Sequence, residues 1–314
     1  MRDMQKCLAF DHAICIHPNK NVTPCCVYMT KQYLQYKDPW QDIFHKQGIQ
    51  SENGFLDECR DCEWEDKEQG HSHKDNLNEK LAGVEGIAYW DLKFNNTCNL
   101  ACRMCRPGES STWTQIVTKE YTDPYYETFE NTKWHKDIDL VLSQLHFVKY
   151  LKFTGGEPFM IPQVWKVLDK CIELDIAKDI EVYITTNATI LKNLETLKHF
   201  KRVQINASVD AIGERYEYIR PGAKWEVVKN NILELNKQFI VTVQALPFIF
   251  NKDHKHELNT WCKQNNIEVT WAPPLYEPEH MRIDALEKCP DKFYKYAELM
   301  DKQHNTNWRE WVNA

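Results

Sequence analysis

Three cysteines lie close together in the sequence as Cys98-Asn-Leu-Ala-Cys102-Arg-Met-Cys105, directly after a strand-like run. Three thiolates on one short loop can hold three irons of a four-iron cluster and leave the fourth iron without a protein ligand. An open coordination position is where a bound metal carries out chemistry. The spacing therefore predicts a reactive metal centre. The alternative is a zinc site, for which His71 and His73 are the nearest candidates as a fourth ligand.

A second strand-like run, residues 148–153, is followed by the turn Gly155-Gly156-Glu157-Pro158. Glycine lets backbone groups approach a ligand closely, and proline fixes the direction of the chain. Such a turn can hydrogen-bond an ammonium group, although an ordinary strand-to-helix turn is the alternative. In this order, each directly after a strand, the cysteine loop and the turn resemble the CxxxCxxC and GGE motifs of the radical S-adenosylmethionine superfamily.

The resemblance implies a chemistry for the cysteine loop. It implies that Cys98, Cys102 and Cys105 hold a [4Fe-4S] cluster and that S-adenosylmethionine chelates the open iron. An electron from a reductant such as flavodoxin or ferredoxin then splits the cofactor into methionine and a 5′-deoxyadenosyl radical, which abstracts hydrogen from a substrate. The protein binds and orients the reactants, because the cofactor carries the difficult chemistry. The resemblance names no residue that acts on the substrate.

Three further segments resemble cofactor-binding elements of the same superfamily. Residues 185–189 resemble a TNG element in which Ala188 replaces the usual glycine. Residues 206–210 resemble an S-x-D element, and Arg220 lies in a segment similar to the IRG element that follows it. Alternatively, Asp210 and Arg220 belong to a helix cap or a surface ion pair. The resemblance assigns cofactor binding to Met104, Gly155, Gly156, Glu157, Thr186, Asn187, Ser208, Asp210, Arg220 and Gln244.

Strand-like runs alternate with amphipathic helical patterns after residue 85. This alternation predicts an α/β fold with a parallel sheet, and the resemblance implies a partial (β/α)6 TIM-like barrel. The motifs fall at the carboxyl ends of strands, the functional edge of such a barrel. Residues 121–144 exceed one crossover helix and are a candidate cover for the opening. The predicted strands are residues 87–94, 148–153, 180–184, 203–209, 241–245 and 267–271, and the clearest helical patterns are 164–172 and 225–235.

The first part of the chain carries a second group of cysteines, which includes the pair Cys59-Arg60-Asp61-Cys62. Such a pair can bind a metal together with cysteines that are distant in the sequence. A metal bound in this way stabilises a small module that has little hydrophobic core. The pattern resembles the auxiliary-cluster modules called SPASM or twitch domains, in which a β-hairpin lies between the first two cysteines. Here the hairpin turn falls at residues 19–21 and lacks the usual glycine, and the module precedes the barrel instead of following it.

The resemblance implies that this module holds a second Fe–S cluster, and the cluster type that we expect is [4Fe-4S]. This cluster accepts an electron from the substrate radical or positions the substrate. A zinc knuckle is the alternative, because four sulfurs suit either zinc or an Fe–S cluster. The isolated Cys171, Cys262 and Cys289 are interpreted as small hydrophobic residues. The implied ligands are Cys7, Cys25, Cys59 and Cys62, with Cys26 or Cys15 as substitutes.

Composition divides the chain into residues 1–84, the cysteine-rich module with its linker, and residues 85–314, the barrel with a helical C-terminal tail. A net charge of -7 and a pI of about 6.0 argue against a general nucleic-acid binder. The first residues are polar, so we expect no secretory leader. No run approaches about 20 apolar residues, so we expect no membrane-spanning helix. Twelve cysteines in such a chain indicate metal ligands in a reducing compartment, so we expect a cytoplasmic protein.

The sequence therefore predicts a radical S-adenosylmethionine enzyme whose leading substrate class is a peptide or protein side chain. A nucleotide-derived or tRNA substrate is the second interpretation. A protein of another class, a non-catalytic Fe–S or zinc binding protein, would explain the cysteines. It would not explain polar cofactor-binding motifs placed after successive strands.

Overall fold

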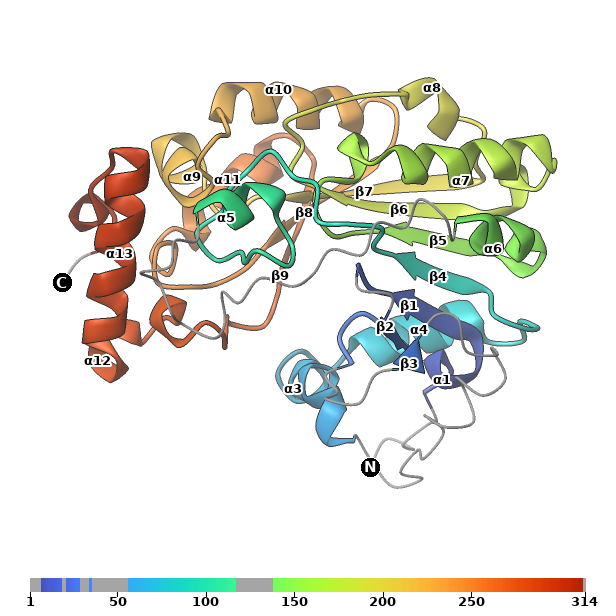
Figure 1. Ribbon diagram of the computed structural model, residues 1–314, viewed down its shortest axis with the longest axis horizontal. Helices are drawn as coiled ribbons and strands as arrows, with labels where there is room; N and C mark the ends of the chain where they lie inside the picture. Colours follow the sequence, from blue (N-terminus) through green and yellow to red (C-terminus); the bar gives the residue numbers. More distant parts are fainter. Residues whose placement is uncertain (1–6, 19–20, 29–33, 36–55, 117–137, 313–314) are drawn as a thin grey trace.

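The computed structural model describes residues 7–18, 21–28, 34–35, 56–116 and 138–312. In this part of the chain one sheet of nine strands runs in the order β3-β2-β1-β4-β5-β6-β7-β8-β9 (Figure 1). The strands are β1 Ala13–Ile16, β2 Asn21–Thr23, β3 Leu34–Gln35, β4 Tyr89–Leu92, β5 Tyr150–Phe153, β6 Glu181–Thr186, β7 Arg202–Ser208, β8 Ile240–Ala245 and β9 Glu268–Trp271.

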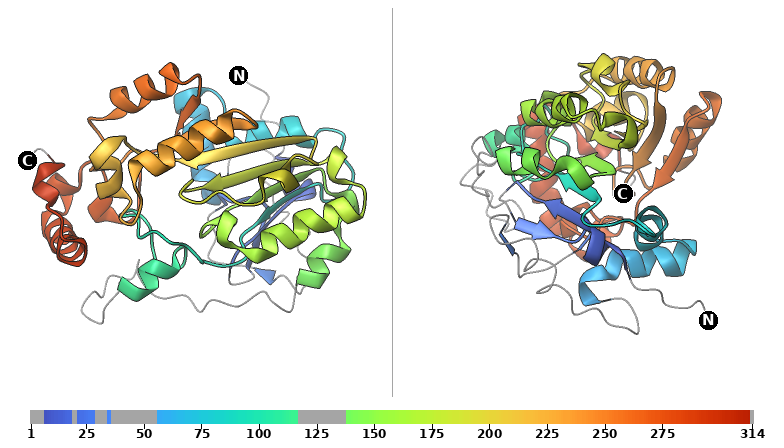
Figure 2. Two further views of the ribbon diagram at one scale, coloured as in Figure 1. Left: turned by 90° about the horizontal axis from the view of Figure 1, so that it is seen from above. Right: turned by 90° about the vertical axis from the view of Figure 1, so that its right-hand side faces the viewer.

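Strands β4 to β9 are parallel and pair in chain order, so the six strands expected from the sequence are confirmed. Because β3 and β9 are the two edges, the curved sheet stays open as a partial barrel (Figure 2). Strand β1 extends it by pairing in parallel with β4. Strands β1 and β2 pair antiparallel, which confirms the expected hairpin, although residues 19–20 of its turn lie outside the described residues.

Helices connect the parallel strands and cover the outer face of the sheet, where α7, α8 and α10 lie side by side (Figure 1). The expected helical patterns at 164–172 and 225–235 are confirmed as α7 and α10. The α-helices are α1 Ala9–His12, α3 Arg60–Gln69, α4 His73–Leu81, α5 Ser111–Ile116, α6 Ile138–Ser143, α7 Pro162–Glu173, α8 Leu194–Leu197, α9 Gly213–Ile219, α10 Trp225–Asn236, α11 Lys255–Gln264, α12 Ala285–Lys288 and α13 Pro290–His304.

Short 3-10 helices lie between these elements. Residues 63–80, which are mostly polar, lie in α3, in α4 and in the short link between them. Of the predicted cover at 121–144, residues 121–137 lie outside the described residues. No described helix has the length and apolar character needed to cross a membrane. The 3-10 helices are η1 Asp57–Cys59, η4 Leu145–Phe147, η5 Pro158–Met160, η6 Ala177–Asp179, η7 Glu279–Met281 and η8 Trp308–Glu310.

The two faces of the sheet differ in polarity because side chains alternate along each strand. One row across β1, β4, β5, β6, β7 and β8 is wholly apolar and packs into the main core with α7 and α10. The neighbouring row, on the opposite face, is mostly polar. The apolar row is Ile16, Leu92, Phe153, Ile184, Ile205 and Val241, and the polar row is Cys15, Asp91, Lys152, Tyr183, Gln204 and Ile240.

Replacing Phe153 by alanine should lower the free energy of unfolding by about 3–5 kcal/mol, because it leaves a cavity in this core. Phe153 is fully buried, and its ring stacks on Phe94 at 6.5 Å between centroids. Phe147, which is 61% exposed, is the matched control, and Phe147→Ala should change stability by less than about 0.5 kcal/mol. Denaturant unfolding followed by circular dichroism measures both, and equal losses would contradict this packing.

Candidate metal and cofactor site

The cysteine loop between β4 and α5 is held by polar groups at the start of α5. The backbone N–H of Cys98 donates to Ser111 Oγ at 3.1 Å, and its carbonyl accepts from Thr112 Oγ1 at 2.8 Å. The indole N–H of Trp113 donates to the carbonyl of Cys102 at 2.7 Å. These bonds fix the backbone at two of the three cysteines and do not use their sulfur atoms.

Arg103, inside the cysteine loop, anchors it to the C-terminal part of the chain. Its side chain is fully buried, and Nε donates to the carbonyl of Tyr218 at 2.7 Å. Nη2 donates to Thr306 Oγ1 at 2.7 Å, and the hydroxyl of Tyr296 in α13 donates to the carbonyl of Arg103. Helix α13 therefore holds the cysteine loop in place through this hydrogen bond to its backbone. Sequence analysis missed this role because Arg103 and Tyr296 lie 193 residues apart.

All three cysteines line one open pocket of about 660 Å³, a volume in the usual range for ligand sites. Burial raises the pKa of the Cys102 thiol to about 11 and also raises the pKa values of Cys98 and Cys105. These thiols are therefore protonated at neutral pH unless a metal displaces their protons. His73 contacts Cys26 in the N-terminal part instead, with 3.8 Å between Nε2 and Sγ. Neither His73 nor His71 lines the pocket within the described residues.

The glycine turn after β5 lies directly against the cysteine loop. Gly155 and Gly156 have φ angles of +74° and +53°, a region that other residues rarely adopt. A Cβ atom on Gly156 would overlap the carbonyl of Thr97. The N–H of Glu157 donates to that same carbonyl at 2.7 Å. Glycine is thus required at position 156 for the turn to dock onto the loop.

Glu157 points into the protein and is fully buried. Its Oε1 accepts from the Thr186 hydroxyl at 2.7 Å and from the N–H of Phe159 at 3.1 Å, while Oε2 accepts from the N–H of Asn187 at 2.7 Å. Burial raises the pKa of Glu157 to about 7, against the lowering effect of these bonds. The carboxyl group therefore joins the end of β5 to the end of β6.

The segment after β6 lies beside the first cysteine. The side-chain amide of Asn187 donates to Asn99 Oδ1 at 3.0 Å and lies 3.8 Å from Cys98 Sγ. Ala188 has a φ angle of +55°, so it adopts the left-handed conformation that the usual glycine would favour. Sequence analysis did not identify Asn99, although it lies next to Cys98.

Asp210 and Arg220 form a buried ion pair at the end of β7. Asp210 Oδ2 accepts from Arg220 Nε at 2.9 Å and from Nη2 at 2.6 Å. Arg220 Nη1 also donates to Cys102 Sγ at 3.6 Å. The alternative of a surface ion pair is therefore wrong, because Asp210 is 1% exposed and Arg220 is 9% exposed. The carboxylate that Arg220 meets in this structure is Asp210.

Most residues assigned by the resemblance converge on the pocket. Within the described residues, Glu157, Asp210 and Gln244 are not among those that line it, and the side chain of Gln244 is exposed. Glu157 and Asp210 instead hold neighbours that do. Their roles toward a cofactor remain predictions. The residues assigned to the metal or the cofactor that do line the pocket are Cys98, Cys102, Met104, Cys105, Gly155, Gly156, Thr186, Asn187, Ser208 and Arg220.

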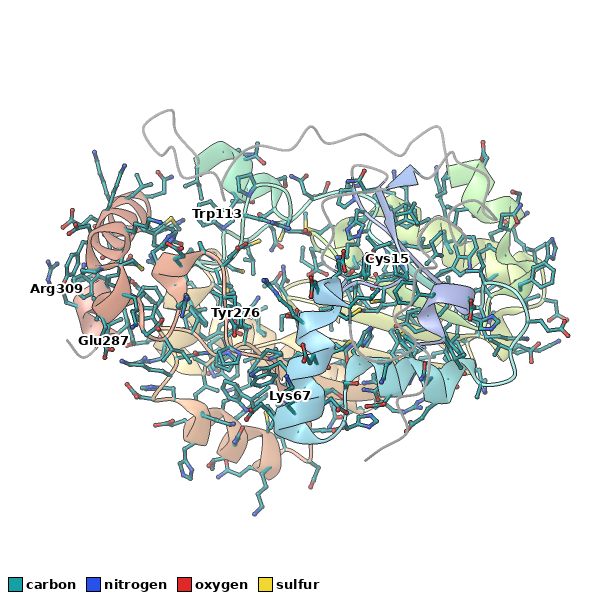
Figure 3. The ribbon with its side chains drawn as sticks, turned by 90° about the horizontal axis from the view of Figure 1, so that it is seen from below. Cys15, Lys67, Trp113, Tyr276, Glu287 and Arg309 are labelled. Carbon is teal, nitrogen blue, oxygen red and sulfur yellow. The ribbon has the colours of Figure 1, made fainter. Side chains whose placement is uncertain are left out.

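The pocket has a second wall that sequence analysis missed. Arg60 and Asp61 of α3 line it, together with residues 272–277 after β9. The guanidinium carbon of Arg60 lies 5.5 Å from the ring centre of Tyr276, and Figure 3 shows Tyr276 beside the helix that carries Lys67. Residues just beyond the carboxyl end of the sixth predicted strand were a signal for this wall, because the other strand ends meet there.

The cysteines of the N-terminal part lie near one another. Burial raises the pKa of the Cys25 thiol, and the nearby Cys26, Cys62 and Cys7 thiols raise it further. Burial and Cys7 also raise the pKa of Cys59, to about 11. Among the described residues, no three His, Cys, Asp or Glu side chains are arranged to hold a single metal ion. The auxiliary ligand set remains a prediction.

Comparison with known proteins identifies the family. The sequence model of the Radical SAM superfamily matches residues 92–264, which is more than half of the chain. The chain therefore belongs to the Radical SAM superfamily. Membership implies a [4Fe-4S] cluster and S-adenosylmethionine as cofactors.

Curated relatives are named GTP 3′,8-cyclase. The relative from Clostridium botulinum strain Hall is 31% identical over 223 residues, 68% of this chain and 65% of its own length. The relative from Peptoclostridium acidaminophilum is 26% identical over 210 residues, 64% of this chain and 60% of its own. The chain thus spans less than two thirds of the length of these relatives.

Solved structures show more distant likeness. Streptococcus suis SuiB bound to precursor peptide SuiA is 18% identical with a TM-score of 0.43, over 69% of this chain and 46% of that one. TYW1 with a lysine-pyruvate adduct is 13% identical with a TM-score of 0.39, over 84% of this chain and 90% of that one.

The residues of the pocket fit the implied cofactors. Three thiols face one cavity, as an iron cluster with one open position requires. Gly155, with a φ angle of +74°, and Gly156 also line the cavity. Because they have no side chains, their backbone groups form this part of the cavity wall. Cys98, Cys102 and Cys105 would hold the cluster, and the glycine turn with Thr186 and Asn187 would hold the cofactor.

Replacing Gly156 by alanine should prevent the turn from docking and abolish S-adenosylmethionine binding, because the new methyl group meets the Thr97 carbonyl. Gly83→Ala is the matched control. Gly83 also has a positive φ angle, +72°, but nothing lies within 4 Å of the added Cβ, so about 1–2 kcal/mol of backbone strain is its only cost. Calorimetric titration of each reconstituted variant with the cofactor measures the difference. Retained binding in the Gly156 variant would contradict the close approach.

Proposed function

We propose that this enzyme cleaves S-adenosylmethionine reductively and abstracts hydrogen from a substrate that enters the pocket between the barrel and α3. The observation that carries the proposal is the convergence of the three cysteines with residues after β5, β6 and β7 on one cavity. When bound, the cluster and cofactor supply the 5′-deoxyadenosyl radical. The protein supplies the binding surfaces and their alignment.

The residues assigned to the cofactor have distinct parts in this proposal. The glycine turn presents backbone groups to the amino end of the cofactor, because no side chain intervenes at Gly155 and Gly156. Thr186 and Asn187, held by Glu157, form the adjoining wall. Met104 offers a polarizable apolar surface to a planar base. Glu157 thus acts through the residues that it orients.

A peptide or protein side chain is the substrate class that the pocket charges favour. Four carboxylates line the cavity, and of its three guanidinium groups Arg220 already pairs with Asp210. A highly charged triphosphate would therefore meet no net positive field. The carboxylates are Asp61, Glu65, Glu109 and Glu277, and the other two cations are Arg60 and Arg106.

A nucleotide is the second candidate substrate. The likeness to relatives named GTP 3′,8-cyclase supports it, over 68% of this chain.

We also propose that Cys7, Cys25, Cys59 and Cys62 hold a second Fe–S cluster that exchanges an electron with the substrate or positions it. A flavodoxin or ferredoxin would supply electrons to the first cluster.

Anaerobic reconstitution followed by incubation with a reductant and S-adenosylmethionine should release 5′-deoxyadenosine. Cys102→Ala should abolish this release, because it removes one ligand of the cluster. Cys171→Ala is the matched control, since Cys171 is buried in α7 away from the pocket, and it should retain the release. Release that survives in the Cys102 variant would contradict the proposed site.

Metal analysis of the same protein tests the second cluster. Two four-iron clusters give about eight irons per chain, whereas a zinc knuckle gives about four irons and one zinc. Deuterium transfer from labelled peptides, or from labelled GTP, to 5′-deoxyadenosine would distinguish the two substrate classes.

A further inference from the structure

Arg220 contacts a sulfur atom of the proposed cluster site. Its Nη1 donates to Cys102 Sγ at 3.6 Å, and the contact is buried from solvent. Cys102 is 8% exposed and Arg220 is 9% exposed. A positive group this close to a thiolate acts through little screening water, so its electrostatic effect is stronger than at a surface.

Asp210 holds the guanidinium in this position. Its Oδ2 accepts hydrogen bonds from both Nε and Nη2 of Arg220. Its Oδ1 accepts a hydrogen bond from the backbone N–H of Leu246 at 2.9 Å. The carbonyl of Asp210 accepts from the side chain of Asn251 at 3.0 Å. Asp210 is therefore fixed to the segment after β8, and it presents one edge of the planar guanidinium to the carboxylate and Nη1 to the sulfur. Only arginine offers this fork.

We propose that the Arg220 N–H to Cys102 contact raises the reduction potential of the cluster held by the cysteine loop, with Asp210 as the positioning residue. Adding an electron increases the negative charge on the cluster and its thiolates. Asp210 pairs with the Nε and Nη2 edge of Arg220, so Cys102 Sγ meets a hydrogen bond from Nη1 at the positive end of this ion pair. That end of the pair stabilises the reduced form more than the oxidised form. This role rests on the proposed function only in that the three cysteines hold an iron cluster.

The test is a redox titration of the reconstituted full-length protein without S-adenosylmethionine, followed by electron paramagnetic resonance. The signal of this cluster is the one that Cys102→Ala removes. At the wild-type midpoint potential, Arg220→Gln should lower the ratio of reduced to oxidised cluster about tenfold, equivalent to 59 mV for one electron. Arg220→Lys keeps a positive charge but loses the fork, so it should lower the ratio about threefold.

Arg202→Gln is the matched control. It removes the same charge from a side chain that is 48% exposed at the opposite end of β7, and it should leave the ratio unchanged. A wild-type ratio in either Arg220 variant with full iron content overturns the proposal. Loss of iron from both variants also overturns it, because a tuning contact is not a condition for cluster binding. Absence of any signal that depends on Cys102 in the unmodified protein would instead defeat the proposed function.

Discussion

The buried carboxyl group of Glu157 is the contact on which the site depends. This carboxyl group joins the end of β5 to the end of β6 and the segment that follows it. The backbone N–H of Glu157 joins the glycine turn to the carbonyl of Thr97, next to the cysteine loop. The side chain of Asn187 then links the segment after β6 to the cysteine loop through Asn99 and Cys98. Three segments that are distant in sequence thus fix one another. Removing the carboxyl group would leave buried donors unsatisfied, at about 1–3 kcal/mol each.

The barrel makes this arrangement possible because its two faces have opposite character. The apolar row through Leu92, Phe153 and Ile184 packs against helices, which fixes the register of neighbouring strands. A slip by one residue would turn the whole row to the other face. Since the strands are parallel and in register, their carboxyl ends meet at one edge, and the loops that follow them must share one space.

The sequence was sufficient to predict the six parallel strands and the pocket residues that lie in motifs after strand ends, because both depend on local patterns. Alternation of apolar residues marks each strand, and each motif follows a strand end. It was insufficient for contacts between distant side chains. The pairing of Arg220 with Asp210 depends on the turn between β7 and α9. The support of Arg103 by α13, and the meeting of Arg60 with Tyr276, likewise depend on how the whole chain folds.

The compositional boundary near residue 85 falls within a continuous structure. Strand β1 pairs in parallel with β4, and Lys152 Nζ on β5 lies 3.1 Å from Cys26 Sγ and 2.9 Å from Asp91. Burying these charges is favourable only when their partners are in place, so the barrel strand and the N-terminal segment stabilise each other. Because α3 also lines the pocket, a substrate would meet surfaces from both parts at once. The cysteine-rich segment therefore shapes the site whether or not it binds metal.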